Sequence, residues 1–367
     1  MQDLLYKIAF ASIRGMGVEL AQKLLDVVGS EKEFFTMPEQ QLKQLTGGRS
    51  RIYKQDYRNQ QLRKAENELK FLQNKNIKLL YYTDKDYPTR LLEACDAPLL
   101  LYSSGSCNLN ARHIISIVGT RHATNYGIAI CRDIVRDLHD SIDDLVIVSG
   151  LAYGIDITAH RAALNTGTPT VAVMPRGLNR IYPADHRNDA INIVRDGGMV
   201  LTDYQSQDEI HKGNFLARNR IIAALSDCTL VVESAARGGA LVTASLAQNY
   251  NRDVFAIPGR VSDEFSRGCN KLIHNNQALC INSASEITAA MRWDTKNTTA
   301  KQLEIFPQLN EDEQKIIDFL KNNSDSHINT ISAQMGIPIY KVMSTLVDLD
   351  CKGLVIALPG SRYAPHL

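Results

Sequence analysis

Short runs of β-branched residues alternate with helical patterns from residue 114 to residue 257, and this alternation limits the possible folds more than any other feature. The expected strands are Ile114–Val118, Leu145–Ser149, Thr170–Met174, Met199–Leu201, Thr229–Val232 and Val254–Ile257. Helical patterns fall between them, including Gly127–His139, Asp156–Asn165 and Ala240–Asn249. Continuously apolar strands separated by helices are typical of a parallel sheet covered on both faces. We therefore expect an α/β protein with a doubly wound, mostly parallel sheet.

Helical segments are expected before this region. Residues 1–70 have apolar positions at helical spacing on both sides of a glycine-bearing turn, Ile13–Gly17. Residues 1–75 contain 13 Lys and Arg against 9 Asp and Glu, a local charge of 13 − 9 = +4. A SAM-like or helix-hairpin-helix-like domain that binds a nucleic-acid backbone and a plain helical interaction module are both compatible with this pattern. The α/β domain is expected over 76–290, with two short β runs at its start, Ile77–Tyr82 and Leu99–Tyr102.

The C-terminal part is expected to be a separate small domain. Residues 291–308 are polar and poorly periodic, which predicts a linker, and 309–367 then show three helices followed by two short strands. This order is that of a winged-helix-like domain. Its 5 Lys and Arg against 7 Asp and Glu give a local charge of 5 − 7 = −2. Protein contact or a structural role is therefore favoured over DNA binding for this domain.

Composition excludes several classes of protein. The net charge of the 367 residues is only +1, so any nucleic-acid site must be a local patch. The seven cysteines are scattered and form no C-x-x-C pair, which argues against a zinc site and a disulfide framework. Because the chain shows neither a signal peptide nor an apolar run of about 20 residues, we expect a cytoplasmic protein that contacts no membrane. G-x-G-x-x-G, G-K-[ST] and G-x-S-x-G are absent, so dehydrogenase and ATPase chemistry find no support and no cofactor is expected.

Glycine-rich loops follow several of the expected strands. In a doubly wound sheet these loops meet at the carboxyl edge, where ligands bind. Glycines let a phosphate approach the backbone closely, and helix N-termini supply N–H donors. One such loop alone would be an ordinary connector, but several on one edge, near basic side chains, favour a polynucleotide backbone. The candidate contacts in these loops are Gly119, Thr120, Arg121, Ser149, Gly150, Ala152, Gly154, Asp156, Gly238 and Gly239.

The segment Phe215–Ser226, FLARNRIIAALS, holds the other candidates. Arg218 and Arg220 flank Asn219, and two cations around a planar amide suit phosphate oxygens or base edges. Lys212 and Phe215 add a charge and a flat ring, which together suit single-stranded nucleic acid. An amphipathic surface helix with solvated arginines is the alternative.

Two further features are interpreted as structural. Asp156 and His160 lie four residues apart, but no cysteine or acid cluster accompanies them, so a helix cap and a surface histidine are favoured over a metal or catalytic pair. Tyr182 and Pro183 are expected only to shape a turn.

Several long motifs in the same order resemble the bacterial DNA-processing protein A family, also called DprA or Smf. They are SGLAYGID (149–156), TPTVAVMPRGLNRIYPADH (168–186), RNRIIAALS (218–226), GGALVTASLAQNYNRDVFAIPG (238–259) and GCNKLI (268–273). The resemblance is strong over 110–285 and weaker over the two ends. Three positions depart from the family pattern: Leu216 replaces a proline, Gly238-Gly239-Ala240 replaces S-G-S, and His186 replaces an asparagine.

The resemblance implies an extended Rossmann-like domain that binds single-stranded DNA. Proteins of this family protect incoming strands and help to load the RecA recombinase during natural transformation. They act as homodimers without recognised catalytic activity. By matching motifs, Arg121, Lys212, Phe215 and Arg218 become the expected DNA contacts, and the helix start around 150–156 becomes a phosphate pocket.

Two other functions remain open at this point. A Rossmann-like nucleotide phosphoribohydrolase would need an acidic residue near the start of the late helix, where the sequence reads ALVTASLAQNY, although Glu233 lies just before that loop. A regulatory module that binds a free nucleotide or dinucleotide is the third interpretation.

Overall fold

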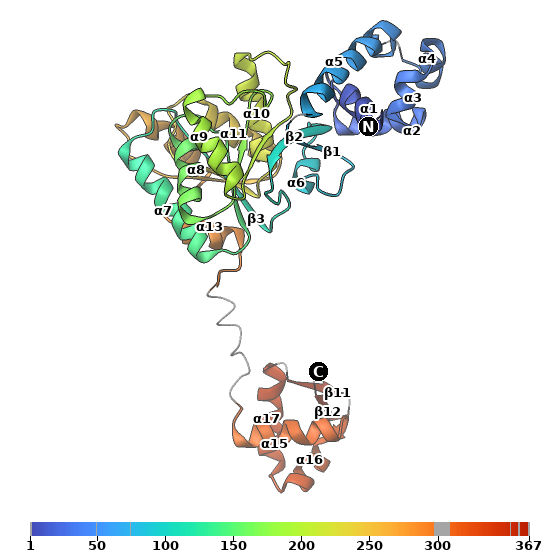
Figure 1. Cartoon of the computed structure of the whole chain (residues 1–367). Helices are drawn as coiled ribbons and strands as arrows, with labels where there is room; N and C mark the ends of the chain where they lie inside the picture. The colour runs from blue at the N-terminus through green and yellow to red at the C-terminus, as the bar shows by residue number, and fades with distance from the viewer. Residues whose placement is uncertain are drawn as a thin grey trace. The chain divides into compact units, whose positions relative to one another are not determined.

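A computed structural model describes residues 2–48, 50–73, 75–296, 309–352, 354–358 and 360–365 of the chain. The chain divides into two compact units, Met1–Lys296 and Asn297–Leu367. The first unit contains a bundle of N-terminal helices and a large α/β domain (Figure 1).

The α/β domain is built on a nine-stranded sheet with the order β1-β2-β6-β5-β4-β3-β7-β8-β9 in the described residues. The strands are β1 Lys78–Tyr81, β2 Leu100–Gly105, β3 His113–Val118, β4 Leu145–Ser149, β5 Thr170–Val173, β6 Met199–Thr202, β7 Cys228–Val231, β8 Asp253–Ala256 and β9 Leu279–Cys280. From β6 to β9 all neighbours run parallel, whereas β1 and β2 pair antiparallel at one edge. The predicted α/β class with a mostly parallel sheet is confirmed. The short edge strand β9 was not predicted, because two residues give no readable period.

Both faces of the sheet are covered by helices, which explains why its strands read as continuous apolar runs. On β3, Ile115 and Ile117 pack with one cluster of helices, and Ile114 and Val118 pack with the other. Helices α7 Asn125–Ser141, α8 Ile155–Thr166, α9 Arg187–Arg195 and α13 Ala284–Met291 contribute to the first face. Helices α10 Lys212–Ala224, α11 Gly239–Asn249 and α12 Arg267–His274 contribute to the second. The short helix α6 Thr89–Leu92 follows β1.

The N-terminal helices pack against the α/β domain through buried polar contacts. They are α1 Gln2–Ala11, α2 Val18–Val28, α3 Glu31–Thr36, α4 Glu39–Thr46 and α5 Gln55–Gln73. Glu68 on α5 is buried and accepts hydrogen bonds from the backbone N–H of Ser206, at 3.0 Å, and from its hydroxyl. Within the bundle, the buried Arg58 donates to the carbonyl oxygens of Phe34 and Met37. The helical bundle is therefore anchored to the segment that follows β6.

Residues 291–296 belong to the first unit, although the sequence placed them in a linker. Trp293 packs on His113, with ring centroids 4.9 Å apart, and its backbone N–H donates to Thr288. Asp294 pairs with Arg112 at 2.5 Å. The polar composition of this segment hid these anchors, which come from residues distant in the sequence. The rest of the expected linker, 297–308, lies outside the described residues.

The described residues of the second unit form three helices and a small antiparallel sheet. The helices are α15 Glu311–Asn322, α16 Ile328–Met335 and α17 Ile339–Cys351, and the strands β10 Ser326–His327, β11 Val355–Leu358 and β12 Arg362–Pro365 lie in the order β10-β12-β11. Asn310 and Glu313 form a capping box at the start of α15. The elements follow the order expected for a winged-helix-like domain, with β10 added.

Candidate nucleic-acid interface

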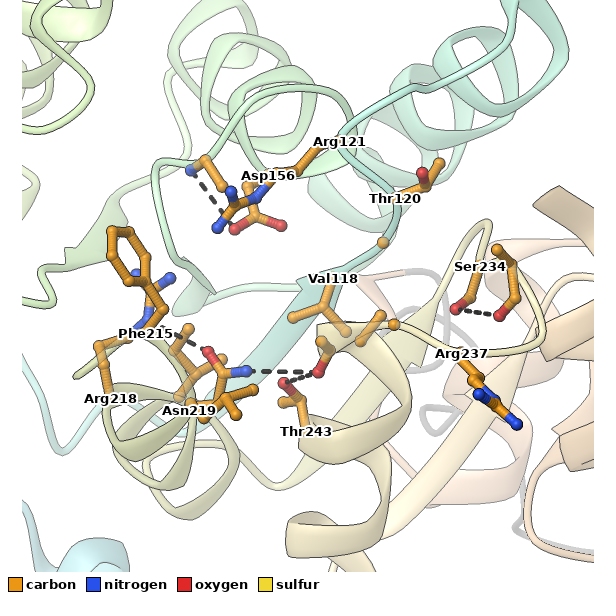
Figure 2. Close-up of a pocket in the computed structure, with 18 of the residues that line it drawn as sticks. Val118, Thr120, Arg121, Asp156, Phe215, Arg218, Asn219, Ser234, Arg237 and Thr243 are labelled. Atoms are coloured by element: carbon orange, nitrogen blue, oxygen red, sulfur yellow. Dashed lines mark hydrogen bonds between the residues drawn. The ribbon is translucent and has the colours of Figure 1, made fainter. Parts of the chain in front are cut away.

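A cavity of about 580 Å³ opens at the carboxyl edge of the sheet. Strand β3 lies between β4 and β7, so the connections that follow β3 and β4 run toward one side and those of β7 and β8 toward the other. Such a topological switch point is where open α/β sheets bind ligands, because the connecting loops diverge there. The loops after β3, β4 and β7 and the helix α10 all contribute to the cavity (Figure 2).

Two glycines are required by the close packing of the loops around this cavity. Gly154 has a φ of +76°, and a Cβ there would lie 2.2 Å from the carbonyl oxygen of Thr120. A Cβ on Gly150 would lie 2.5 Å from the guanidinium of Arg218. The loop after β4 is thus pressed against both the β3 loop and α10, which holds the walls of the cavity together.

A cation and two aromatic rings form one side of the cavity. The Arg121 guanidinium lies 5.4 Å from the centre of the Phe215 ring, within the range of a cation–π contact. Tyr182 packs edge-on against the same ring, with centroids 5.2 Å apart and an interplanar angle of 69°. Arg121, Lys212 and Tyr182 are exposed, and Phe215 is half-buried. Tyr182 was missed as a site residue because it was interpreted only as part of a turn. Its place in the loop after β5, within the motif 168–186, was the available signal.

The charge around the cavity is strongly positive. Four cationic side chains contribute to its lining, those of Arg121, Lys212, Arg218 and Arg237, against the single carboxylate of Asp156. The net charge of the whole chain is only +1, so the cavity is a local concentration of positive charge. Such a site favours polyanions over neutral ligands.

Arg218 is not a free cation, contrary to the expectation from its motif. It is only 4% exposed, and its Nη1 donates to the carbonyl oxygens of Gly150, at 2.6 Å, and Val173. Burial lowers the pKa of the Arg218 guanidinium to about 10, so it stays charged near neutral pH. Its side chain holds the loop after β4 in place, and these backbone partners give it a structural role that its motif did not predict.

Arg220 lies outside the cavity. Its guanidinium pairs with the Asp203 carboxylate and donates to the carbonyl oxygen of Asp96, and it lines a different hollow beside the N-terminal helices. Residues two positions apart in a helix are rotated by about 200° around its axis, so Arg218 and Arg220 cannot share a face. The prediction that both flank a common ligand did not consider the helical geometry of this segment, which lies within α10 from Lys212 onward.

Asp156 and His160 lie in the interior. The Asp156 carboxylate accepts from the Ala152 N–H at 3.4 Å, and burial raises its pKa against the opposing charges of Arg218 and Arg121. His160 is fully buried, with Nδ1 2.8 Å from the hydroxyl of Thr170, so the expected surface histidine is wrong. Burial lowers the pKa of His160 to about 3. It is a neutral core residue of α8.

The remaining predicted residues divide between lining and support. Gly119, Thr120, Ala152, Asn219, Gly238 and Gly239 line the cavity. Asn219 accepts from Arg218 Nε at 3.2 Å and donates to the Gly239 carbonyl at 3.3 Å, which links α10 to the start of α11. Ser149 is buried and donates to the Ile117 carbonyl at 2.6 Å, so it supports the sheet rather than the cavity.

Glu233, the acid nearest to the late helix, has a structural role. It is 3% exposed, and its carboxylate accepts from the backbone N–H of Thr124 at 2.9 Å and from the Thr124 hydroxyl at 2.5 Å. The side chain thereby caps the start of α7 and is not among the residues that line the cavity.

Two kinds of feature are absent from the described residues. These residues hold no group of three or more His, Cys, Asp or Glu side chains placed to bind a metal ion. Likewise, no helix within them combines the length and the apolar character needed to cross a membrane.

Residues 78–292 match the family model described as DNA recombination-mediator protein A, which covers more than half of the chain. The chain belongs to this family. Protein Smf from Synechocystis sp. is 32% identical over 327 residues, which span 79% of this chain and 81% of that protein. The recombination-mediator family resemblance expected from the loop motifs is confirmed.

Two solved structures are similar to this member of the recombination-mediator family. DNA processing protein A (DprA) from Streptococcus pneumoniae has a TM-score of 0.65 and 29% identity, covering 78% of this chain and 96% of that one. DNA processing protein A from Helicobacter pylori, studied for its single-stranded DNA binding mode, has a TM-score of 0.53 and 30% identity, covering 60% and 97%. Both likenesses support the extended Rossmann-like fold.

Proposed function

We propose that this protein binds single-stranded DNA in the cavity at the carboxyl edge of the sheet and acts as a recombination mediator rather than an enzyme. The observation that carries the proposal is the Arg121 guanidinium over the Phe215 ring, 5.4 Å from its centre, at the mouth of a glycine-lined and cationic cavity. Cations beside an aromatic face suit an unpaired strand, because the backbone requires positive charge and each base has a face that stacks.

The side chains divide the recognition between backbone and bases. Arg121 and Lys212 are exposed and neutralise phosphates, while the backbone N–H groups at the start of α11, around Gly238 and Gly239, face phosphate oxygens. Phe215, with Tyr182 at its edge, provides the surface for a base. Stacking does not distinguish strongly between bases, so binding has little sequence preference.

Family membership extends the proposal to recombination during DNA uptake. The similar Helicobacter pylori protein binds single-stranded DNA, and we place the same activity in this chain. We further propose that the protein acts as a homodimer, protects incoming strands and helps to load RecA. The matching test is RecA filament formation on protein-covered single strands, in which this protein increases the rate of loading. An unchanged rate would refute the mediator role and leave strand binding intact.

Binding itself is tested by fluorescence anisotropy with labelled oligothymidylate over a salt series. The affinity falls as salt rises, because neutralised phosphates release counterions. Arg121→Ala weakens binding, whereas Arg136→Ala, an exposed arginine on α7 whose charge is engaged with Asp133 and Asp137, serves as the matched control and leaves it unchanged. Equal effects of the two variants on DNA affinity would refute the assignment of the cavity as the DNA-binding site.

The two alternative functions predict different results. A phosphoribohydrolase would release free base from nucleoside monophosphates, and the use of Glu233 as a helix cap argues against this activity. A nucleotide-binding regulatory module would bind a mononucleotide tightly enough to displace oligothymidylate. We expect no free base and no displacement at comparable concentrations.

A further inference from the structure

A second pair of stacked rings connects the loop after β3 with the segment after β8 at the same edge of the sheet. His122 follows β3 and stacks on Phe265, with ring centroids 6.1 Å apart and an interplanar angle of 29°. His122 is exposed and lines the cavity, and Phe265 is half-buried. Neither residue belongs to the sequence segments that contain the first ring pair, Tyr182 and Phe215.

The second ring pair is fixed to the cavity wall by the backbone. The carbonyl oxygen of Phe265 accepts from the N–H of Ser234 at 2.6 Å, and the N–H of Gly268 donates to the Ser234 carbonyl at 2.8 Å. A Cβ on Gly268 would lie 2.4 Å from the carbonyl oxygen of Ala235. The segment that carries Phe265 is therefore packed tightly on the loop after β7.

The topology gives the separation of the strands that precede Tyr182 and Phe265. Tyr182 follows β5 and Phe265 follows β8, and four inter-strand steps separate these strands in the order β5-β4-β3-β7-β8. At ~4.8 Å a step, the strands that carry them are roughly 19 Å apart. That is about six nucleotides at the ~3.4 Å spacing of stacked bases, and fewer for an extended strand.

Two cationic side chains follow strands that lie between β5 and β8. Arg121 follows β3, the central strand of this span, and Arg237 follows β7, the strand next to β8. Figure 2 shows Phe215 and Arg237 on opposite sides of the cavity, with Arg121 and Thr120 above it. One continuous strand can thus contact a ring pair at each end and phosphate-binding side chains in the middle.

We propose that His122 and Phe265 form a second base-stacking subsite, which engages a nucleotide several positions away from the one on Phe215. The proposal rests on the function proposed above and adds a minimum length and a defined track to it. Near Phe265 the exposed charges balance, with Arg260 and Arg267 against Asp263 and Glu264. This subsite therefore works by stacking and contributes little to the salt dependence.

The test compares the thymidine dinucleotide with an oligothymidylate of about 12 nucleotides. The dinucleotide is too short to reach both subsites even when extended, and the longer strand can reach both. Phe265→Leu keeps an apolar side chain but removes the flat ring, and Phe265→Tyr retains it. We expect Phe265→Leu to weaken binding of the longer oligonucleotide about five- to tenfold, the lower end of the stacking range because the ring is half-buried. The shorter oligonucleotide and the salt slope stay unchanged, and Phe265→Tyr restores the affinity.

Matched controls separate this inference from the proposed function. Val261→Ala, at an 88% exposed residue of the same loop, should leave both affinities unchanged. Thermal melting checks that each variant is folded. Two results would refute the second subsite and leave the first intact. In one, Phe215→Leu lowers the affinity and Phe265→Leu does not. In the other, Phe265→Leu lowers the affinity for both oligonucleotides equally. If the wild-type protein binds neither oligonucleotide, both proposals fall.

Discussion

Replacing Arg218 by alanine tests whether this arginine supports the site or contacts the ligand. The change removes the donors to the carbonyl oxygens of Gly150 and Val173 and the positive charge next to Asp156. Each buried carbonyl left without a donor costs about 1–3 kcal/mol, so the two carbonyls together cost about 2–6 kcal/mol. We therefore expect a loss of about 2–6 kcal/mol in the free energy of unfolding.

The single tryptophan gives an assay that is specific for the first unit. Trp293 packs on His113 at the base of the sheet, so its fluorescence during urea denaturation reports on this unit alone. Arg121→Ala is the matched control, since Arg121 is exposed and its removal should change stability by no more than about 0.5 kcal/mol. The two arginines line the same cavity, but their alanine variants should have different effects. Arg218→Ala should lower the stability, and Arg121→Ala should lower the DNA affinity.

The result that would refute this reasoning is a stable Arg218→Ala protein with wild-type unfolding and a selective loss of DNA binding. Arg218 would then be a ligand for phosphate, as its sequence motif suggests. Arg218→Lys adds a second comparison, because a single ammonium cannot reproduce the planar fork that reaches both carbonyl oxygens. We expect it to recover only part of the lost stability.

Three further predictions concern binding and acid stability. Arg121→Ala and Lys212→Ala should each reduce the slope of log affinity against log salt by about 0.7, the value for one phosphate on a single strand, as measured by anisotropy; an unchanged slope would show that the residue contacts no phosphate. Phe215→Leu should weaken oligothymidylate binding by about 1–3 kcal/mol with the salt slope unchanged, and a changed slope would contradict a stacking role. His160 is neutral in the folded protein because burial lowers its pKa from 6.5 to about 3, whereas the unfolded chain takes up the proton near the ordinary value. Lowering the pH from about 7 to about 5 should therefore reduce the free energy of unfolding by about 2 kcal/mol through this residue. In urea denaturation followed by the fluorescence of Trp293, His160→Gln should lack that part of the pH dependence. Identical pH profiles for the wild-type protein and the variant would refute this role of His160.

The α/β fold and the place of the cavity followed from the sequence by itself. Continuous apolar runs separated by helical patterns are compatible with a parallel sheet covered on both faces, as found for β3. Glycine-rich loops after such strands must meet at one edge, because all the strands point the same way. Gly150 and Gly154 could therefore be placed near Arg121 without knowledge of any contact.

The roles of the cations were decided only by the tertiary structure. Lys212, Phe215 and Asn219 lie three and four positions apart and share one face of α10, whereas Arg218 is buried under the β4 loop and Arg220 pairs with Asp203 on another side. Motif spacing shows which residues are basic but not which backbone carbonyls or carboxylates lie within reach. Those partners come from β4, β5 and the segment after β6, and only folding brings them next to α10.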